Sequence, residues 1–249
     1  MIETRSVGDV IEIRFARPPV NALNDAMLTA IHDALIAATR GAARAIVLAG
    51  RPGMFSAGLD VPSLLGKNPA EMRVFWRLFF DVQRLLAGSP IPVACAITGH
   101  SPAGGAVLAM YCDYRVMAQG AFKIGLNEVA VGIHPGPVIH GVLRRVVGAR
   151  RAELLLASAR MLTPDEALAV GLVDELVAPE EVVDRAIAWA QNLARLPAAA
   201  LAATRALARA DLIEIVRTAA IEGDESLGDH WFDPETQAAL KAMVAKLKK

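Results

Sequence analysis

Polar and apolar residues alternate over residues 2–15, around the turn-forming pair Gly8 and Asp9, and this period of two predicts a β-hairpin. Two runs, residues 45–49 and 92–97, are almost wholly apolar, which is typical of strands buried on both faces. Gly99 and Pro102 are expected to break the second run. Weaker apolar segments predict three more strands, at residues 114–117, 121–124 and 173–177.

Between these strands the apolar positions change to helical spacing. Asn24 is a suitable N-cap for a helix with a five-residue apolar face, consisting of Met27, Leu28, Ile31, Leu35 and Ile36. A second helix, over residues 70–86, is predicted to stack four apolar side chains: Val74, Leu78, Val82 and Leu85. Strands and helices thus alternate through the first half of the chain, which favours an α/β fold.

Beyond Val138 the pattern is almost entirely helical. Thr163 and Glu166 form a capping box, with Pro164 at the first helical position. Further helices are predicted to begin near residues 179, 197, 211 and 234, the last one capped by Asp233. We therefore expect an α/β core at residues 1–195 and a helical region at residues 196–249 that belongs to the same functional unit.

The composition limits the partners. The 249 residues have a net charge of zero, and 54% of them are hydrophobic. The neutral charge argues against nucleic acid as a partner, and the apolar surplus indicates buried helices and a subunit interface. Cys95 and Cys112 lie in apolar segments and are interpreted as buried free thiols of a reducing compartment. No signal-like segment opens the chain, so we expect a cytoplasmic protein.

Residues 89–112 contain no Lys, Arg, Asp or Glu and are long enough to span a bilayer. Pro92, Gly99, Pro102 and the pair Gly104-Gly105 interrupt them, however. Irregular backbone in lipid would leave polar groups without partners. We interpret this stretch as protein core and expect no membrane association.

Common catalytic signatures are absent from the sequence. The five histidines are scattered, and there is no H-E-x-x-H or C-x-x-C spacing for a metal ion. Neither a Walker A nor a G-x-G-x-x-G motif follows a strand. The G-x-S-x-G pattern is missing too, because Ser56 lacks the preceding glycine.

Two glycine-rich turns remain, residues 56–60 and 102–105, and each follows a short buried strand. Ligands bind at the carboxyl edge of open α/β sheets, where both turns are expected to lie. Backbone N–H groups of Ala57 and Gly104 would together form an oxyanion hole, with Gly104 in the first turn of a helix. Taken alone, the second turn is equally explained as a close packing turn.

Glu128 is a single carboxylate between apolar residues, in the segment I-G-L-N-E-V-A-V-G-I. Burial raises the pKa of a carboxyl group towards that of a useful base. The alternative is an acid at a helix start, with Asn127 as its cap. Spacing alone leaves both interpretations open.

These segments resemble the enoyl-CoA hydratase/isomerase (crotonase) family. The resemblance rests on F-S-A-G-L-D at residues 55–60, S-P-A-G-G at 101–105 and C-D-Y-R at 112–115. P-P-V-N at residues 18–21, R-P-G at 51–53 and I-G-L-N-E at 124–128 are most similar to the mitochondrial-type short-chain 3,2-trans-enoyl-CoA isomerases. The resemblance runs from about Pro18 to Val177. It implies a spiral of β-β-α units with a helical C-terminal trimerisation region.

By position, the resemblance implies that Ala57 and Gly104 hold the thioester oxygen and that Glu128 is the base. The hydratases carry a second glutamate three residues after the oxyanion glycine, where this chain has Val107. The acyl-CoA would also contact seven further positions: Ala22, Ser56, Gly58, Leu59, Asp60, Asn127 and, on the last helix, the cation Lys246. By resemblance the helix with Trp76 flanks the acyl pocket, but core packing explains its aromatic residues equally well.

The activity implied is a one-base shift of the double bond of a 3-enoyl-CoA to the trans-2-enoyl-CoA. No cofactor is implied, since CoA is part of the substrate, and a homotrimer or a dimer of trimers is expected. Other crotonase chemistry, including hydration of crotonyl-CoA, remains an alternative, as does an acyl-CoA-binding protein without turnover. RNA binding would need a lysine-rich helix, and residues 24–40 contain no lysine.

Overall fold

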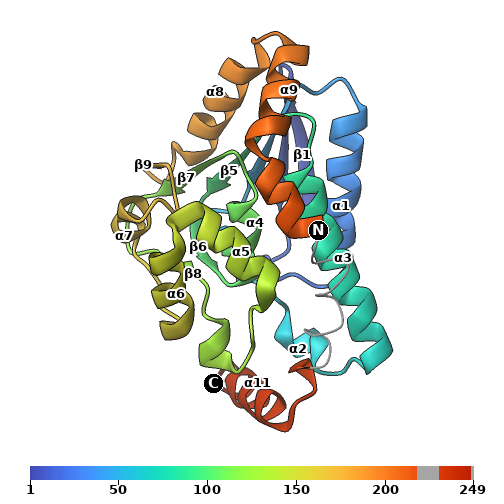
Figure 1. The fold of residues 1–249 in the computed structure, drawn as a ribbon, viewed down its shortest axis with the longest axis vertical. Helices are drawn as coiled ribbons and strands as arrows, with labels where there is room; N and C mark the ends of the chain where they lie inside the picture. The colour runs from blue at the N-terminus through green and yellow to red at the C-terminus, as the bar shows by residue number, and fades with distance from the viewer. Residues whose placement is uncertain (218–229, 248–249) are drawn as a thin grey trace.

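The chain forms two β-sheets, in which most strands are parallel, with helices packed around them (Figure 1). The computed structural model describes residues 1–217 and 230–247. Its larger sheet has the order β1-β2-β3-β5-β7-β9. These strands are β1 Ile2–Val7, β2 Val10–Phe15, β3 Ala45–Ala49, β5 Val93–Ile97, β7 Tyr114–Ala118 and β9 Glu175–Val177. Only β1 and β2 are antiparallel, because their two-residue turn is a hairpin whereas helices connect the others.

A smaller parallel sheet follows the first, formed by β4 Gly53–Met54, β6 Gly99–Pro102 and β8 Ile124–Gly125. Each of β3, β5 and β7 leads within a few residues into one of these short strands and then into a helix. Three such β-β-α units wind the chain into a spiral, which confirms the expected fold class. Strand β5 ends at Ile97, which confirms the expected break, but the sequence did not predict that a second short strand, β6, begins at Gly99. Strand 121–124 is wrong, since β8 is only Ile124–Gly125.

The helices surround the sheets. Their bounds are α1 Asp25–Arg40, α2 Val61–Leu64, α3 Pro69–Ala87, α4 Gly104–Met110, η1 Glu128–Val131, α5 Gly136–Val147, α6 Ala149–Ser158, α7 Pro164–Ala169, α8 Val182–Ala194, α9 Ala198–Ala208 and α11 Pro234–Leu247. Residues 210–217 are also helical. In the described part of the chain no helix is long and apolar enough to cross a membrane.

The strands in the middle of the large sheet are buried on both faces, as their apolar runs predicted. In β3, Ile46 and Leu48 pack with α1, α3 and α4, while Val47 packs beneath α8. The face towards α8 is rich in alanine, so this helix approaches the sheet closely. Cys95 and Cys112 are buried free thiols, as expected, and burial raises the pKa of Cys95.

Helix α3 differs from its predicted orientation. Val74, expected in the buried stripe, is 60% exposed. Val82 is buried as predicted, but the buried face is largely aromatic and consists of Met72, Phe75, Trp76, Phe79, Phe80, Val82, Gln83, Leu86 and Ala87. Large aromatic side chains bury more apolar area than valine, so they decide which face of the helix turns inward. Helix α1 agrees better, with Ile36 alone of its five predicted positions only partly buried.

Candidate active site

The two glycine-rich turns lie side by side. Leu23 ties the first turn in place, because its N–H donates to Gly58 O at 2.7 Å and its carbonyl accepts from Asp60 N at 2.9 Å. Gly58 has φ +81, and a Cβ atom added there would stand 2.8 Å from the Gly104 nitrogen. Glycine is therefore needed at Gly58 both for the backbone conformation and for the close approach of the second turn.

The backbone N–H groups of Leu59 and Gly104, one on each turn, have no acceptor among the described residues. Both residues line the cavity that contains Glu128. Two unpaired N–H groups on neighbouring turns are the arrangement needed to bind one oxyanion.

The expected donor Ala57 requires a correction. Its N–H donates to Val20 O at 2.9 Å, so this amide is already used within the fold. The first backbone N–H group of this turn without an acceptor is that of Leu59, two residues further along the chain. Sequence spacing did not reveal this, because the partner of Ala57 comes from the distant extended segment before α1.

Ala103 sets the direction of the second turn. It has φ 47 and ψ −121, a backbone conformation that alanine rarely adopts. Its N–H donates to Gly125 O at 2.8 Å, and its carbonyl accepts from Val107 N at 2.9 Å. These bonds at both ends of the residue hold the strained turn and leave the Gly104 N–H at the start of α4 unpaired.

Glu128 begins η1 and is only 8% exposed. Its Oε2 atom is buried with no hydrogen-bond partner among the residues that the structure describes. Burial raises the pKa of this carboxyl group to about 7. Asn127 does not cap it through its side chain, so the helix-start interpretation lacks its expected hydrogen bond. The arrangement favours a base.

Glu128 lies in the lining of two cavities, of which we call the larger the outer chamber and the smaller the inner chamber. An outer chamber of about 330 Å³ is lined by Val20, Ala22, Ala57, Leu59, Asp60, Val61, Pro62, Ala103, Asn127, Glu128, Val131, Ile133 and Met243. An inner chamber of about 20 Å³ is lined by Leu59, Trp76, Phe79, Gly104, Val107, Glu128, Ile133, His134, Pro135 and Ile139. Leu59, Glu128 and Ile133 line both chambers, so the residue with the free amide and the residue with the buried carboxyl group lie between the two.

Some expected substrate contacts have structural roles instead. The Ser56 hydroxyl donates to Asn21 O at 2.8 Å and accepts from Gly58 N at 3.2 Å, and the side chain is fully buried. Neither Ser56 nor Gly58 is among the described lining residues. They shape the turn and do not face the chamber.

The remaining expected contacts are distributed unevenly. Ala22 and Asn127 line the outer chamber, as does Asp60, which also pairs with Arg17 at 2.5 Å. Lys246 is exposed on α11 and is not among the described lining residues, so its contact with CoA stays a prediction. The sequence did not indicate Met243, which brings α11 to the chamber.

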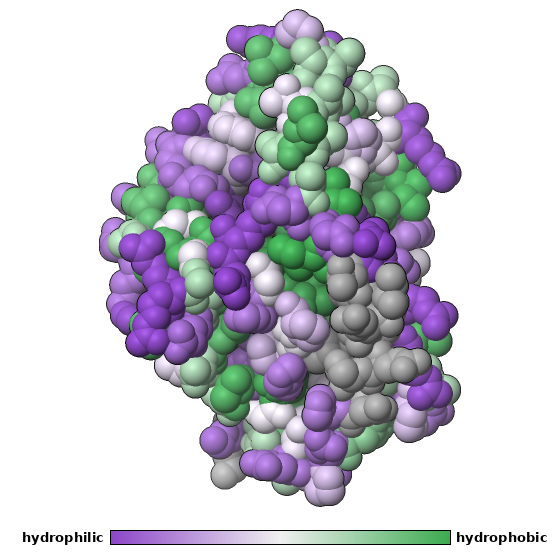
Figure 2. All heavy atoms as spheres, in the orientation of Figure 1, coloured by the Kyte–Doolittle hydropathy of each residue, from purple (hydrophilic) through white to green (hydrophobic). Residues whose placement is uncertain are grey.

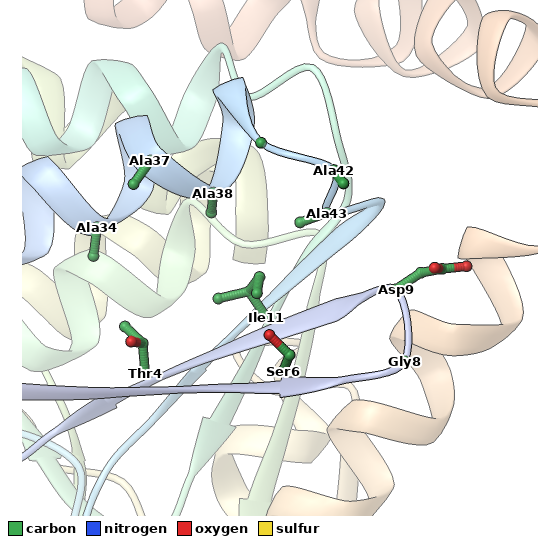
Figure 3. Close-up of a pocket in the computed structure, with 11 residues that line it drawn as sticks. Thr4, Ser6, Gly8, Asp9, Ile11, Ala34, Ala37, Ala38, Ala42 and Ala43 are labelled. Atoms are coloured by element: carbon green, nitrogen blue, oxygen red, sulfur yellow. The ribbon is translucent and has the colours of Figure 1, made fainter.

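A larger cavity, of about 410 Å³, lies between the β1–β2 hairpin and the end of α1 (Figure 3). Its walls are mostly small side chains, and Asp9, its one ionisable residue among those described, projects away from it. It holds no base or nucleophile of the kind found at Glu128. Within the described ranges, no cluster of side chains suits a metal ion either. The chambers at Glu128 are therefore the candidate active site.

This fold and site define the class of protein. The chain belongs to the enoyl-CoA hydratase/isomerase family, whose sequence profile matches residues 5–249. It is 33% identical to human mitochondrial enoyl-CoA delta isomerase 1 over 212 residues, which are 84% of this chain and 70% of that protein.

Solved structures and other relatives agree on the family but differ in named activity. The crystal structure of human mitochondrial delta3-delta2-enoyl-CoA isomerase matches with a TM-score of 0.94 at 30% identity, covering 99% of this chain and 98% of that one. The relative named "Probable enoyl-CoA hydratase echA17" from Mycobacterium avium (strain 104) is 38% identical over 77% of this chain and 74% of its own length. Family membership thus leaves the choice between isomerisation and hydration to the site.

Proposed function

We propose that this protein is a 3,2-trans-enoyl-CoA isomerase that uses Glu128 as its only base. The observation that carries the proposal is that Glu128, with one buried carboxyl oxygen that has no partner among the described residues, and Val107 line the same inner chamber. Hydration needs a second carboxylate to share the proton transfers with the attacking water, and valine cannot supply one. A double-bond shift needs one base that takes and returns a proton.

The reaction follows from this geometry. The N–H groups of Leu59 and Gly104 bind the thioester oxygen of a 3-enoyl-CoA. Ionised Glu128 removes a proton from C2, and the electron pair passes into a dienolate whose charge collects on that oxygen. Protonated Glu128 then returns the proton to C4, and the double bond closes between C2 and C3. The two donors act in the transition state, where one such donor typically contributes about 10²–10³ in rate. No cofactor takes part.

The outer chamber would hold the arm of CoA that carries the thioester. Its lining is largely apolar, with Asn127 and Asp60 as polar exceptions. Human mitochondrial enoyl-CoA delta isomerase 1 is a relative whose name states an isomerase activity on enoyl-CoA, and because another relative is named a hydratase, the choice between the two rests on Glu128 and Val107.

The test follows ultraviolet absorbance of purified protein with a 3-enoyl-CoA and, separately, with crotonyl-CoA. We expect the 3-enoyl-CoA to be converted much faster than crotonyl-CoA is hydrated. Glu128→Gln should lower the isomerase rate by about 10²–10⁴-fold while saturated acyl-CoA still binds. Hydration of crotonyl-CoA at an equal or higher rate would contradict the assignment. An acyl-CoA-binding protein would bind both thioesters without turnover.

A further inference from the structure

One peptide group connects helix α11 to the backbone of Glu128. The carbonyl of Gly132 accepts a hydrogen bond from Thr236 Oγ1 at 2.7 Å. On the other side of the same peptide group, the N–H of Ile133 donates to the backbone carbonyl of Glu128 at 2.9 Å. Because a peptide group is planar and rigid, the Thr236 side chain is joined to the backbone of Glu128 through a single rigid unit.

Gly132 lets α11 come this close to η1. It follows η1 directly and has φ +76. A Cβ atom added there would stand 2.9 Å from the Cβ atom of Ala239 and 3.4 Å from the Cα atom of Thr236, so only glycine keeps this spacing. Thr236, Ala239 and Met243 share one face of α11, and Met243 lines the outer chamber. The same helix face therefore contacts the end of η1 and reaches the chamber.

The Glu128 carboxyl group depends on this backbone for its position. η1 is a single four-residue turn without a side-chain cap, and turns of this 3₁₀ type have poorer hydrogen-bond geometry than an α-helix. Oε2 of Glu128 has no partner among the described residues that would hold the side chain directly. The backbone of residues 128–133 therefore places the carboxyl group, and Thr236 holds that backbone from outside.

Few other ionisable groups surround Glu128 in the part of the chain that the structure describes. The described lining of the two chambers adds only Asp60, which pairs with Arg17, and His134, whose ring lies against that of His230. The ionisable side chains of α11 are exposed and belong to neither lining: Glu235, Lys241 and Lys246. Burial is hence the main influence on the carboxyl group, and burial depends on how closely α11 and η1 pack.

We propose that Thr236 is a positioning residue for the base: its hydroxyl group fixes the peptide group after Gly132 and so keeps Glu128 buried beside the thioester site. The inference rests on the proposed function, in which Glu128 moves the proton. Thr236 acts only through η1 and contacts no reacting atom. Loss of its hydroxyl group leaves the Gly132 carbonyl unpaired and frees η1 to move, so water reaches the carboxyl group.

The first experiment compares Thr236→Val with Thr236→Ser. Valine keeps the size of the side chain but cannot donate, whereas serine keeps the hydroxyl group. Carbon-13 NMR follows the titration of the Glu128 carboxyl group, with Glu128→Gln identifying its signal, so no turnover is needed. We expect a midpoint of about 7 in the wild type and in Thr236→Ser, and a midpoint lower by about one pH unit or more in Thr236→Val.

The same variants are then assayed with a 3-enoyl-CoA. Thr236→Val should lower kcat by about tenfold to 10²-fold, because a displacement of about 1 Å in a reacting group has an effect of this size. KM should change less, since the thioester donors Leu59 and Gly104 lie on other turns. Thr236→Ser should retain most of the wild-type kcat.

Ser89→Ala is the matched control. The Ser89 hydroxyl group also donates to a backbone carbonyl, that of Ile91, at 2.7 Å, and Ser89 and Thr236 are both 7% exposed. Its loss should lower the melting temperature but leave kcat and the Glu128 titration unchanged. A loss of kcat in Ser89→Ala as large as in Thr236→Val would overturn the inference. So would a Thr236→Val protein that titrates and turns over like the wild type.

A second pair of variants keeps the test decisive if Thr236→Val does not fold. Ala239→Leu presses on Gly132 and should shift the titration and kcat in the same direction. Ala238→Leu, on the exposed side of α11, should change neither, and equal effects of the two leucine variants would overturn the inference. If Thr236→Val shifts the Glu128 titration while the wild type does not turn over a 3-enoyl-CoA, the proposed function fails and the role of Thr236 stands.

Discussion

Glu128 is an ionisable side chain that the fold keeps from water. Its charged form is therefore less favourable, relative to its neutral form, than that of a solvated glutamate. Its pKa of about 7 has burial as the main cause. One carboxyl oxygen has no partner in the described part of the chain, which leaves it available to take a proton from a substrate.

The first prediction concerns pH. The base must be ionised in the free enzyme, so kcat/KM for a 3-enoyl-CoA should level off above about pH 7 and fall about tenfold per pH unit below it. The measurement is the initial isomerase rate at low substrate across this range. A midpoint near 4.5, the ordinary value for glutamate, would show that burial does not control the base.

The second prediction concerns stability. Folded Glu128 holds its proton more tightly than unfolded Glu128, so the stability of the wild type falls as pH rises from about 4.5 to about 7. Glu128→Gln carries no such charge. Its free energy of unfolding, relative to wild type, should therefore rise across that window by about 3 kcal/mol. Urea unfolding at both pH values measures this. If the difference in free energy of unfolding between the two proteins did not depend on pH, Glu128 would be a solvated acid in the first turn of a helix.

The third prediction compares two glycines with the same conformation, Gly58 and Gly53, both at φ +81. Alanine at Gly53 meets nothing within 4 Å, so it should cost only the backbone strain of about 1–2 kcal/mol and keep activity. Alanine at Gly58 would press on the Gly104 nitrogen and should also lower kcat. The melting temperature of both variants measures backbone strain, and their turnover measures damage to the site. Equal turnover in the two variants would show that the close approach of residue 58 to the Gly104 nitrogen is not needed for catalysis.

At the scale of elements, each β-β-α unit ends at the candidate site or beside it. The first unit supplies Leu59, the second Gly104 and the third Glu128. Each of these residues follows a short strand of the small sheet, so this sheet aligns the three groups although its strands are only two to four residues long.

Helix α9 is attached to this core by a buried ionic cluster. Asp113 pairs with Arg205 at 2.7 Å and with Arg209 at 2.9 Å, and it accepts from Val93 N at 2.8 Å. Arg209 also donates to Tyr111 O at 2.6 Å. Burial lowers the pKa of Arg209, an effect that the charge of Asp113 opposes. Asp113 therefore has a structural role.

The fourth prediction removes this anchor. Asp113→Asn leaves two buried guanidinium groups without their counter-charge and should reduce the free energy of unfolding by about 3–5 kcal/mol. Glu153→Gln is the control, because it breaks the exposed pair with Arg150 and should change stability by less than about 1 kcal/mol. Chemical denaturation provides both values. Equal losses would mean that the buried cluster is not what attaches α9.

At the scale of the whole molecule, several large apolar side chains remain exposed on the helical half: Leu154, Leu168, Leu196, Leu207 and Ile213. Figure 2 shows apolar surface over α9, between hydrophilic areas. An apolar area of this kind on the surface is typical of one that another protein covers.

The fifth prediction is that the chain assembles into a trimer or a dimer of trimers. Light scattering at micromolar concentration should give three or six times the mass of one chain, which is 26.4 kDa. Leu207, which is 82% exposed, is the position to test, and Leu207→Asp should lower the mass. Val74→Asp, an exposed position on α3, serves as the control. A stable monomer for the wild type would contradict the expected assembly and any contribution of Lys246 to a neighbouring site.

The sequence by itself determined the features that depend on neighbouring residues. The hairpin follows from alternation, the capping box at Thr163 and Glu166 from two residues three apart, and the central strands from continuous apolar runs. The order of short motifs indicated the family, and this resemblance, not the spacing around Glu128, implied that Glu128 is the base.

Only the tertiary structure decided which amide is free at the site. Ala57 and Leu59 are equivalent in sequence, but Val20, far away in the chain, accepts from one and leaves the other unpaired. The short strands of the small sheet and the inward aromatic face of α3 depend on distant partners in the same way. Hydrogen bonds and burial between remote segments form only when the chain has folded, so a local pattern cannot contain them.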